Sequence, residues 1–307
     1  MLLSSLLFAC AESPVVSDGP APQPVPTLKP VQLALNWYPE PEFGGFYDAA
    51  LRGLYRDAGL EVTVVPGGPG VPVLELLAAG RVDVAITGAD DLLVRRAKGL
   101  DAVAVYAGFQ DSPVGLLVHA PGPARYEDVV GPVAAEAGSP FQQFVWARYA
   151  WEGKVELVPT TGTIAPFMAN PASAQQAYVT SEPCLAEAQG ASVGFLPAKE
   201  AGWNPYASLA VVRGGEKAEG WVGKFVSASQ AGWEHYLVDP AVANAEIVKL
   251  DPELGGGKID CVVARQAAYV RGTAGVGRVE GARFVELAEA LNSVGVVVSG
   301  EGAYLER

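Results

Sequence analysis

The chain has 307 residues, half of them hydrophobic, and its 34 acidic and 21 basic side chains give a formal net charge of −13. This charge argues against a protein that binds nucleic acid, because such a protein needs a basic face to neutralise phosphates. The hydrophobic content excludes disorder for most of the chain. With 36 Gly and 24 Pro, the sequence favours many turns between short elements, as in an α/β protein.

The three cysteines and two histidines show none of the spacings that are typical of a zinc or haem site. We therefore expect no metal and no other cofactor. Cys184 and Cys261 lie far apart, each in an apolar context. Two buried free thiols are the favoured interpretation, and a disulfide between them stays an alternative.

The first ten residues form an apolar run that is too short to span a bilayer, which needs about 20 residues. The run ends in Leu7-Phe8-Ala9-Cys10, which resembles a bacterial lipobox, so Cys10 is the predicted lipidation site. An ordinary secretory signal is the alternative, because no Lys or Arg precedes Lys29. The Pro-rich residues 11–30 predict a stiff tether between a membrane surface and the folded domain.

Apolar strands alternate with short helices over residues 31–106. Strands are predicted over 31–35, 60–65, 82–86 and 102–106, and helices over 46–58, 73–79 and 92–98. A glycine follows each of the three helices, as is typical of helix ends. Continuous apolar strands that are joined by helices indicate a parallel sheet buried on both faces.

A second series of strands begins at residue 115. Strands are predicted over 115–119, 133–135, 155–158, 177–180 and 207–212, and an aromatic helix over 141–151. Ser139 and Pro140 are typical first residues for that helix. Further helices are expected over 221–238, 241–250 and 282–293. This order suggests two α/β lobes, the second inserted within the first.

The segment Leu35-Asn-Trp-Tyr-Pro-Glu-Pro-Glu-Phe-Gly-Gly-Phe-Tyr47, together with residues 50–62, is similar to the opening signature of one family of binding proteins. This family comprises ABC-transporter substrate-binding proteins for thiamine-pyrimidine precursors, sulfonates, nitrate and related solutes. Weaker matches occur at residues 77–86, 178–183, 232–233 and 239–240, so the resemblance covers about residues 31–298.

The resemblance implies a two-lobed type II periplasmic binding protein fold with a ligand cleft between the lobes. Residues 31–111 and 211–307 would form lobe one and residues 112–210 lobe two, with chain crossings near 108–112 and 207–212. The family further implies a solute-binding lipoprotein in the periplasm or at the cell surface, anchored to a membrane and working with ABC permease subunits.

An aromatic loop directly follows the first predicted strand. Trp37 and Tyr38 offer stacking surfaces for a flat ring, and Asn36 can donate and accept hydrogen bonds at its edge. Glu42 can accept from an amine, and Phe43 stands where pyrimidine-related members often have His. The alternatives are that Trp37 belongs to the core and that Glu42 is a solvated carboxylate.

Other residues predicted to bind the ligand lie at strand ends and at the first crossing. They are Thr87, Gly88, Asp90, Gln110, Ser139, Phe141 and Glu182. Backbone N–H groups at the loops beginning at Thr87 and Gly138 would point into the cleft. Because Asp90 and Asp91 are acidic and no Arg or Lys flanks these loops, we expect a small heteroaromatic ligand, thiamine-pyrimidine-precursor-like or flavin-like. An alkyl sulfonate or nitrate stays the alternative.

An enzymatic function is the less favoured hypothesis. Some proteins resembling this family make the thiamine pyrimidine, using a Lys that carries pyridoxal phosphate and a nearby His. The matching positions here are Thr87 and Asp91, which supply neither an amine nor an imidazole. A third alternative is a surface protein that engages another protein, which predicts a cleft filled by its own side chains. We therefore expect a binding protein and not an enzyme.

Overall fold

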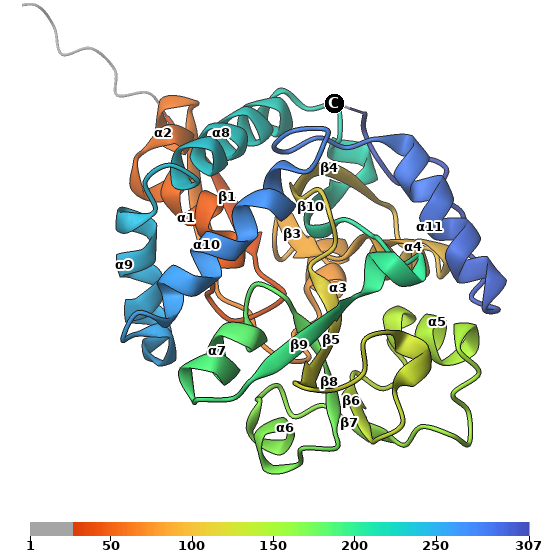
Figure 1. Ribbon diagram of the computed structural model, residues 1–307. Coiled ribbons are helices and arrows are strands. Elements are labelled where there is room, and N and C mark those ends of the chain that lie inside the picture. Colours follow the sequence, from red (N-terminus) through yellow and green to blue (C-terminus); the bar gives the residue numbers. More distant parts are fainter. Residues whose placement is uncertain (1–26, 307) are drawn as a thin grey trace, which may run out of the picture.

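A computed structural model describes residues 27–306 as two α/β lobes, each built around a five-stranded sheet (Figure 1). This confirms the predicted two-lobed α/β class. The predicted lipidation site Cys10 and nearly all of the predicted tether lie outside the described residues. Within residues 27–306, no helix combines the length and the hydrophobicity that crossing a bilayer requires.

The sheet of the first lobe has the strand order β2-β1-β3-β10-β4. Its strands are β1 (Lys29–Ala34), β2 (Leu60–Val65), β3 (Val84–Thr87), β4 (Ala102–Phe109) and β10 (Ala207–Arg213). Strand β1 is parallel to β2 and β3, whereas β10 is antiparallel to β3 and β4. The prediction of a wholly parallel sheet is therefore wrong, because β10 returns from the inserted lobe and runs in the opposite direction.

The sheet of the second lobe has the order β7-β6-β8-β5-β9. Its strands are β5 (Val114–His119), β6 (Val133–Ala135), β7 (Leu157–Pro159), β8 (Ala174–Tyr178) and β9 (Val193–Pro197). Strand β6 is parallel to β7 and β8, and β5 is antiparallel to β8 and β9. The sequence did not predict β9, which contains Gly194 and is mostly half-buried.

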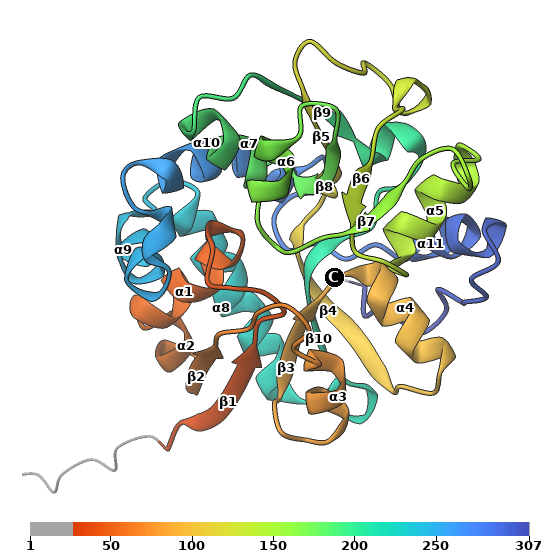
Figure 2. The ribbon, with the colours of Figure 1, turned by 90° about the horizontal axis from the view of Figure 1, so that it is seen from below.

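Helices cover both faces of the first sheet, as Figure 2 shows. One face carries α1 (Gly44–Leu51), α2 (Leu54–Asp57), α8 (Gly220–Tyr236), α9 (Ala241–Leu250) and α10 (Lys258–Arg271); the other carries α3 (Val73–Ala78), α4 (Ala89–Ala97) and α11 (Gly281–Ser293). The second lobe has α5 (Pro140–Arg148), α6 (Ala165–Ala169) and α7 (Glu182–Ala188). Short 3-10 turns are η1 (Pro41–Phe43), η2 (Tyr126–Asp128), η3 (Ala198–Ala201), η4 (Gly214–Glu216) and η5 (Pro252–Leu254).

Two glycines at the start of α1 let α8 approach closely. A Cβ atom at Gly45 would lie 2.1 Å from the ring of Trp233, and one at Gly44 would lie 2.1 Å from that of Tyr236. Both aromatic side chains are completely buried. The glycine pair therefore fixes α1, and with it the preceding turn η1, against the core of the first lobe.

The chain crosses between the lobes at residues 110–113 and 198–206, since β10 belongs entirely to the first sheet. The return crossing thus precedes the predicted segment 207–212. The two crossings are tied to each other: Asn204 Oδ1 accepts from Ser112 N at 2.8 Å, and Asn204 Nδ2 donates to Asp111 Oδ1 at 2.9 Å. The guanidinium of Arg283 donates to the carbonyls of Gln110 and Asn204 at 2.8 and 2.6 Å.

Cys184 and Cys261 form a disulfide, with 5.9 Å between their Cα atoms. The prediction of two free thiols is therefore wrong. The cysteines are 77 residues apart, and they meet because α10 of the first lobe packs along α7 of the second. Neither helix is among those predicted from the sequence, so the sequence alone gave no basis for this pairing.

Candidate functional site

Two adjoining cavities of about 200 and 600 Å³ lie between the lobes. Both are lined by Asn36, Gly88, Glu136, Gln176 and Tyr178, so they form one continuous cleft. Asn36 follows β1 and Gly88 follows β3, which places the cleft at the carboxyl ends of parallel strands. Open α/β sheets typically bind their ligands at this edge.

Aromatic side chains from both lobes line the smaller cavity, which we call the ring cavity. Trp37 and Phe43 come from the first lobe, and Tyr178 comes from the end of β8 in the second. Trp37 is half-buried, and a Cβ atom at Gly162 of the second lobe would lie 3.7 Å from its ring. The loop around Gly162 therefore lies close against the indole. Such aromatic surfaces suit a flat ring.

Four carboxyl groups also line the ring cavity, those of Glu40, Glu42, Glu136 and Glu182, whereas none of its lining residues within 27–306 is Lys or Arg. Glu42 is only 2% exposed, and its Oε1 accepts a hydrogen bond from Thr180 Oγ1 of the other lobe at 2.6 Å. Its Oε2 is buried and has no partner within residues 27–306. A buried acceptor without a partner costs free energy, so this oxygen is suited to receive a donor from a ligand.

Burial raises the pKa values of these carboxyl groups. It raises that of Glu182 to about 7, although Oε2 of this residue accepts from Tyr178 N at 2.7 Å, which favours the ionised form. The pKa of Glu42 is raised by burial and lowered in part by the Thr180 hydrogen bond. Burial, and then the charges of Glu42 and Glu182, hold the pKa of Glu40 well above its ordinary value. The ring cavity therefore favours ligands that bring positive charge or hydrogen-bond donors.

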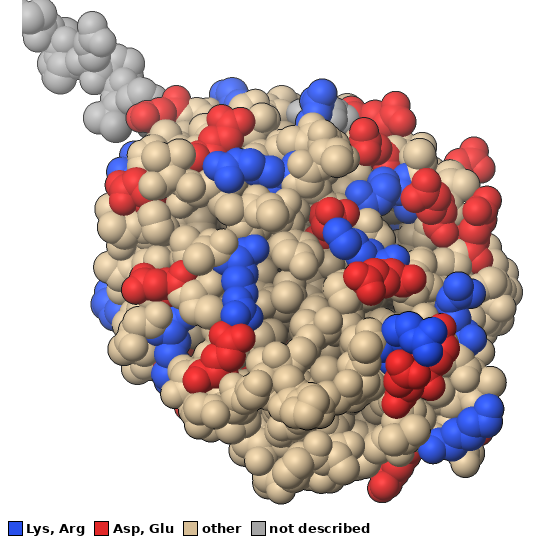
Figure 3. All heavy atoms as spheres, in the orientation of Figure 1, with Lys and Arg blue, Asp and Glu red and all other residues tan. Residues whose placement is uncertain are grey.

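The larger cavity, which we call the outer cavity, is more polar. Asp90 and Asp91 line it from the start of α4, and Glu136 lines it from the second lobe. Burial, and then the charge of Asp91, raises the pKa of Asp90 to about 7. Arg95 and Lys98 also line this cavity. On the face seen in Figure 3, by comparison, acidic and basic side chains are interspersed and neither sign dominates.

Nine of the twelve predicted ligand-binding residues line the cleft. Those that line the ring cavity are Asn36, Trp37, Glu42, Phe43, Gly88 and Glu182. Those that line the outer cavity are Asp90, Ser139 and Phe141. The Ser139 side chain also caps α5, since its Oγ accepts a hydrogen bond from Gln142 N at 3.2 Å.

The other three predicted residues line neither cavity. Tyr38 is 46% exposed, beside the edge of Trp37. Thr87 is buried within β3. The buried amide of Gln110 donates to the carbonyls of Ala107 and Arg278 at 3.2 and 3.0 Å, so it braces the crossing between the lobes.

Most of the second-lobe residues that line the cleft were not predicted from the sequence. Glu136, Gln175, Gln176 and Tyr178 all line it, as does Glu40 of the first lobe. One signal was present in the sequence: Gln175 and Gln176 are polar residues within the otherwise apolar strand β8. Because neighbouring side chains of a strand point to opposite faces, this pair places one amide on each face of a central strand, where apolar side chains are usual.

The raised pKa values predict how the stability of the ligand-free protein depends on pH. The pKa values of Glu182 and Asp90 are about 7 in the folded protein, against ordinary values of 4.5 and 3.8. From about pH 4 to 7 these groups bind more protons in the folded than in the unfolded chain, so their contribution to stability is lost as the pH rises. We expect thermal denaturation to give a melting temperature a few degrees higher at pH 5.5 than at pH 8.

The variant Glu182→Gln should reduce that difference, because it removes one of the two groups. A melting temperature of the ligand-free protein that is higher at pH 8 than at pH 5.5 would mean that these carboxyl groups are not desolvated as described.

The two lobes and the cleft between them define the periplasmic binding protein fold. The chain belongs to the NMT1/THI5-like family, whose model matches residues 40–243. This confirms the resemblance that residues 35–62 indicate.

Two characterised relatives are similar in sequence. The formylaminopyrimidine-binding protein of Halalkalibacterium halodurans is 29% identical over 161 residues, which cover 47% of each chain, so the match spans about half of that relative. The riboflavin-binding protein RibY of Chloroflexus aurantiacus is 28% identical over 273 residues, which cover 82% of this chain and 77% of the relative.

Solved structures share the fold at lower identity. The periplasmic aliphatic sulphonate binding protein SsuA from Escherichia coli has a TM-score of 0.70 and 16% identity, over 91% of this chain and 92% of its own. The desulfurization enzyme DSZB has a TM-score of 0.53 and 16% identity, over 86% and 91%. The fold alone therefore does not separate binding from catalysis, and the side chains of the cleft must decide.

Proposed function

We propose that this protein is the extracytoplasmic solute-binding component of an ABC importer and that its ring cavity binds a small planar nitrogen heterocycle. The observation that carries the proposal is the buried carboxyl group of Glu42, whose Oε2 has no partner within residues 27–306. Glu42 lines a cavity together with aromatic side chains and other carboxyl groups, and none of the described residues that line it is Lys or Arg. An amino group or a protonated ring nitrogen supplies the donor that this oxygen lacks, and the aromatic side chains supply stacking area.

The same features disfavour an anion in the ring cavity. A sulfonate or a nitrate brings acceptors and negative charge, and placing these against Glu40, Glu42 and Glu182 costs free energy through like-charge repulsion. Arg95 and Lys98 lie in the outer cavity, where Asp90, Asp91 and Glu136 oppose them.

Cavity size bears on the kind of heterocycle. Ligand sites typically measure about 300–1,000 Å³, so the ring cavity of about 200 Å³ suits a single ring. A larger ligand has to extend into the outer cavity of about 600 Å³. The two relatives are named for a ligand of each kind: formylaminopyrimidine has a single ring, and riboflavin is the larger ligand.

Two positions support binding over the synthase reaction, those where the related synthases carry Lys and His. Thr87 is buried within β3, and Asp91 lines the outer cavity. Neither side chain forms an imine with pyridoxal phosphate. The proposed role is therefore to capture a solute and hand it to permease subunits.

Anchoring through Cys10 is part of the proposal, supported by Leu7-Phe8-Ala9-Cys10 ahead of the Pro-rich residues 11–30. We expect the full chain, expressed with a basic segment added before Met1, to fractionate with membranes. The variant Cys10→Ser should move most of the protein to the soluble fraction. Equal membrane association of the two proteins would contradict the lipid anchor.

Calorimetric titration at pH 8 tests the ligand class. We expect formylaminopyrimidine or riboflavin to bind, with an alkanesulfonate and nitrate as matched anionic controls that give no signal. Saturable binding of the sulfonate, with no heat from either heterocycle, would contradict the proposal and favour the anion-binding alternative.

A further inference from the structure

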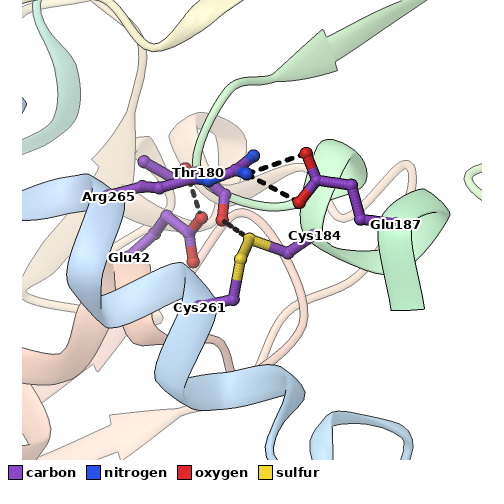
Figure 4. The surroundings of a disulfide bond; sticks show 6 residues. All are labelled: Glu42, Thr180, Cys184, Glu187, Cys261 and Arg265. Atoms are coloured by element: carbon purple, nitrogen blue, oxygen red, sulfur yellow. Dashed lines mark hydrogen bonds and ion pairs between the residues drawn. A yellow bond between two sulfur atoms is a disulfide. The ribbon is translucent and has the colours of Figure 1, made fainter. Parts of the chain in front are cut away.

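Three interactions join the lobes at one edge of the cleft, between α7 and the segment formed by α10 and η1 (Figure 4). The disulfide connects Cys184 of α7 with Cys261 of α10. Arg265 Nη2 donates to both carboxylate oxygens of Glu187, at 2.7 and 2.9 Å. The Thr180–Glu42 hydrogen bond completes the set. Of the three, only the disulfide is covalent.

This edge is also part of the ring cavity. Ser181 and Glu182, which line the cavity, precede Cys184 in the chain by three and two residues. Cys184 Sγ lies 3.6 Å from the carbonyl oxygen of Thr180. On the other side, α10 packs against η1, which contains Glu42. The disulfide therefore fixes the start of α7 directly opposite the carboxyl group that carries the proposed function.

The disulfide also lies apart from the chain crossings. Tyr269 in α10 accepts hydrogen bonds through its carbonyl oxygen from the backbone N–H groups of Gln110 and Asp111, at 2.9 and 3.1 Å, so this end of α10 meets the first crossing. Cys261 is eight residues earlier in the same helix, about 12 Å away at a rise of 1.5 Å per residue. Helix α10 thus meets the first crossing at Tyr269 and is bonded to the second lobe at Cys261, at two separated places.

Two separated attachment points restrict how one body moves relative to another. One lobe can then rotate relative to the other only about the line that joins the first crossing to the disulfide, and this line runs along α10. Twisting about other axes is blocked while the disulfide is intact. The ion pair between Arg265 and Glu187 cannot replace this restraint, because its side chains are 32% and 44% exposed and exposed pairs are weak.

We propose that the Cys184–Cys261 disulfide is a positioning element of the ligand site. It confines the motion of the lobes to one hinge axis along α10 and keeps the segment Thr180–Glu182 facing Glu42 before any ligand arrives. Its effect on affinity rests on the proposed function. A protein whose binding-competent arrangement is only partly populated shows an apparent Kd that is weakened by that fraction.

Hydrogen exchange and ligand titration on the full chain test this role. The wild type is compared before and after reduction with a phosphine and after removal of the reductant, and the double variant Cys184→Ser/Cys261→Ser is measured beside it. We expect faster exchange at residues 178–182 and at both crossings in the reduced protein and in the variant. The apparent Kd for formylaminopyrimidine or riboflavin should rise about tenfold, as it does if the competent fraction falls to a tenth.

Reoxidation should restore both readouts, and the reductant should leave the double variant unchanged. The matched control Arg265→Gln removes the ion pair but keeps the disulfide, and it should change Kd less than about twofold.

Unchanged exchange at 178–182 together with an unchanged Kd would overturn the inference. So would global loss of protection across β1 to β4 on reduction, because the disulfide would then serve stability and not the site. If neither heterocycle binds the oxidised wild type, the proposed function fails, whereas the exchange data on the ligand-free protein still decide the hinge restraint.

Discussion

Replacing Trp37 by alanine should weaken ligand binding at least tenfold and leave the melting temperature close to that of the wild type. Trp37 is half-buried at the margin of the first lobe's core and lines the ring cavity, so we expect its removal to affect the site more than the core. Stacking contributes about 0.5–1.5 kcal/mol beyond the burial of area, and about 1.4 kcal/mol corresponds to a tenfold change in Kd. Titration of both proteins, read beside their melting curves, measures this effect.

Trp233 provides the matched control within the same lobe. It is completely buried and packs against Gly45 and Phe46. Trp233→Ala should therefore lower the free energy of unfolding by about 3–5 kcal/mol. If Trp37→Ala instead destabilises the protein to this extent and the remaining folded fraction binds normally, Trp37 is a core residue and the ring cavity has been assigned wrongly.

The variant Glu42→Gln should weaken binding of the heterocycle about 10- to 100-fold at pH 8. Hydrogen bonds to charged groups contribute about 1.5–3 kcal/mol, and an amide nitrogen in place of Oε2 would face the ligand's donor with another donor. The Thr180 hydrogen bond can persist on the remaining oxygen, so the fold should survive. Glu61→Gln, at a 44% exposed carboxyl group that pairs with Arg56, is the control and should leave Kd unchanged.

The same pair of proteins gives a pH profile with a defined sign. Burial raises the pKa of Glu182 to about 7, so its carboxylate form declines below neutral pH, and burial also raises the pKa of Glu42 above its ordinary value. Wild-type affinity should fall from pH 8 to pH 5.5, and Glu42→Gln should show a smaller fall. Equal Kd values for the wild type and Glu42→Gln at pH 8 would remove Glu42 from the ligand site.

Much of the fold was predictable because its signals are local. The strands of the first lobe are apolar runs that glycines separate, and β1 to β4 lie within about three residues of the predicted ranges. The helix predicted over 46–58 is two helices, because Gly53 adopts a left-handed backbone with φ of 78°. The reversed direction of β10 and the pairing of Cys184 with Cys261 depend on packing between distant segments, which periodicity does not encode.

The site was predictable mainly on the side of the first lobe, although Ser139, Phe141 and Glu182 of the second lobe were also among the predicted residues that line the cleft. Asn36, Trp37 and Glu42 follow directly on a strand, and the carboxyl end of a parallel strand is a cleft edge whatever the rest of the chain does. The facing residues Tyr178 and Glu136 line the cleft only because of how the second lobe is placed. Local sequence carries no information on that placement.

A crystal structure of the protein with formylaminopyrimidine or riboflavin bound tests the central claim most directly. The account predicts a flat ring in the ring cavity, with its plane against Trp37 and a nitrogen donor within hydrogen-bond distance of Glu42 Oε2. A ligand seated only in the outer cavity, with Glu42 Oε2 still unpartnered, would contradict it.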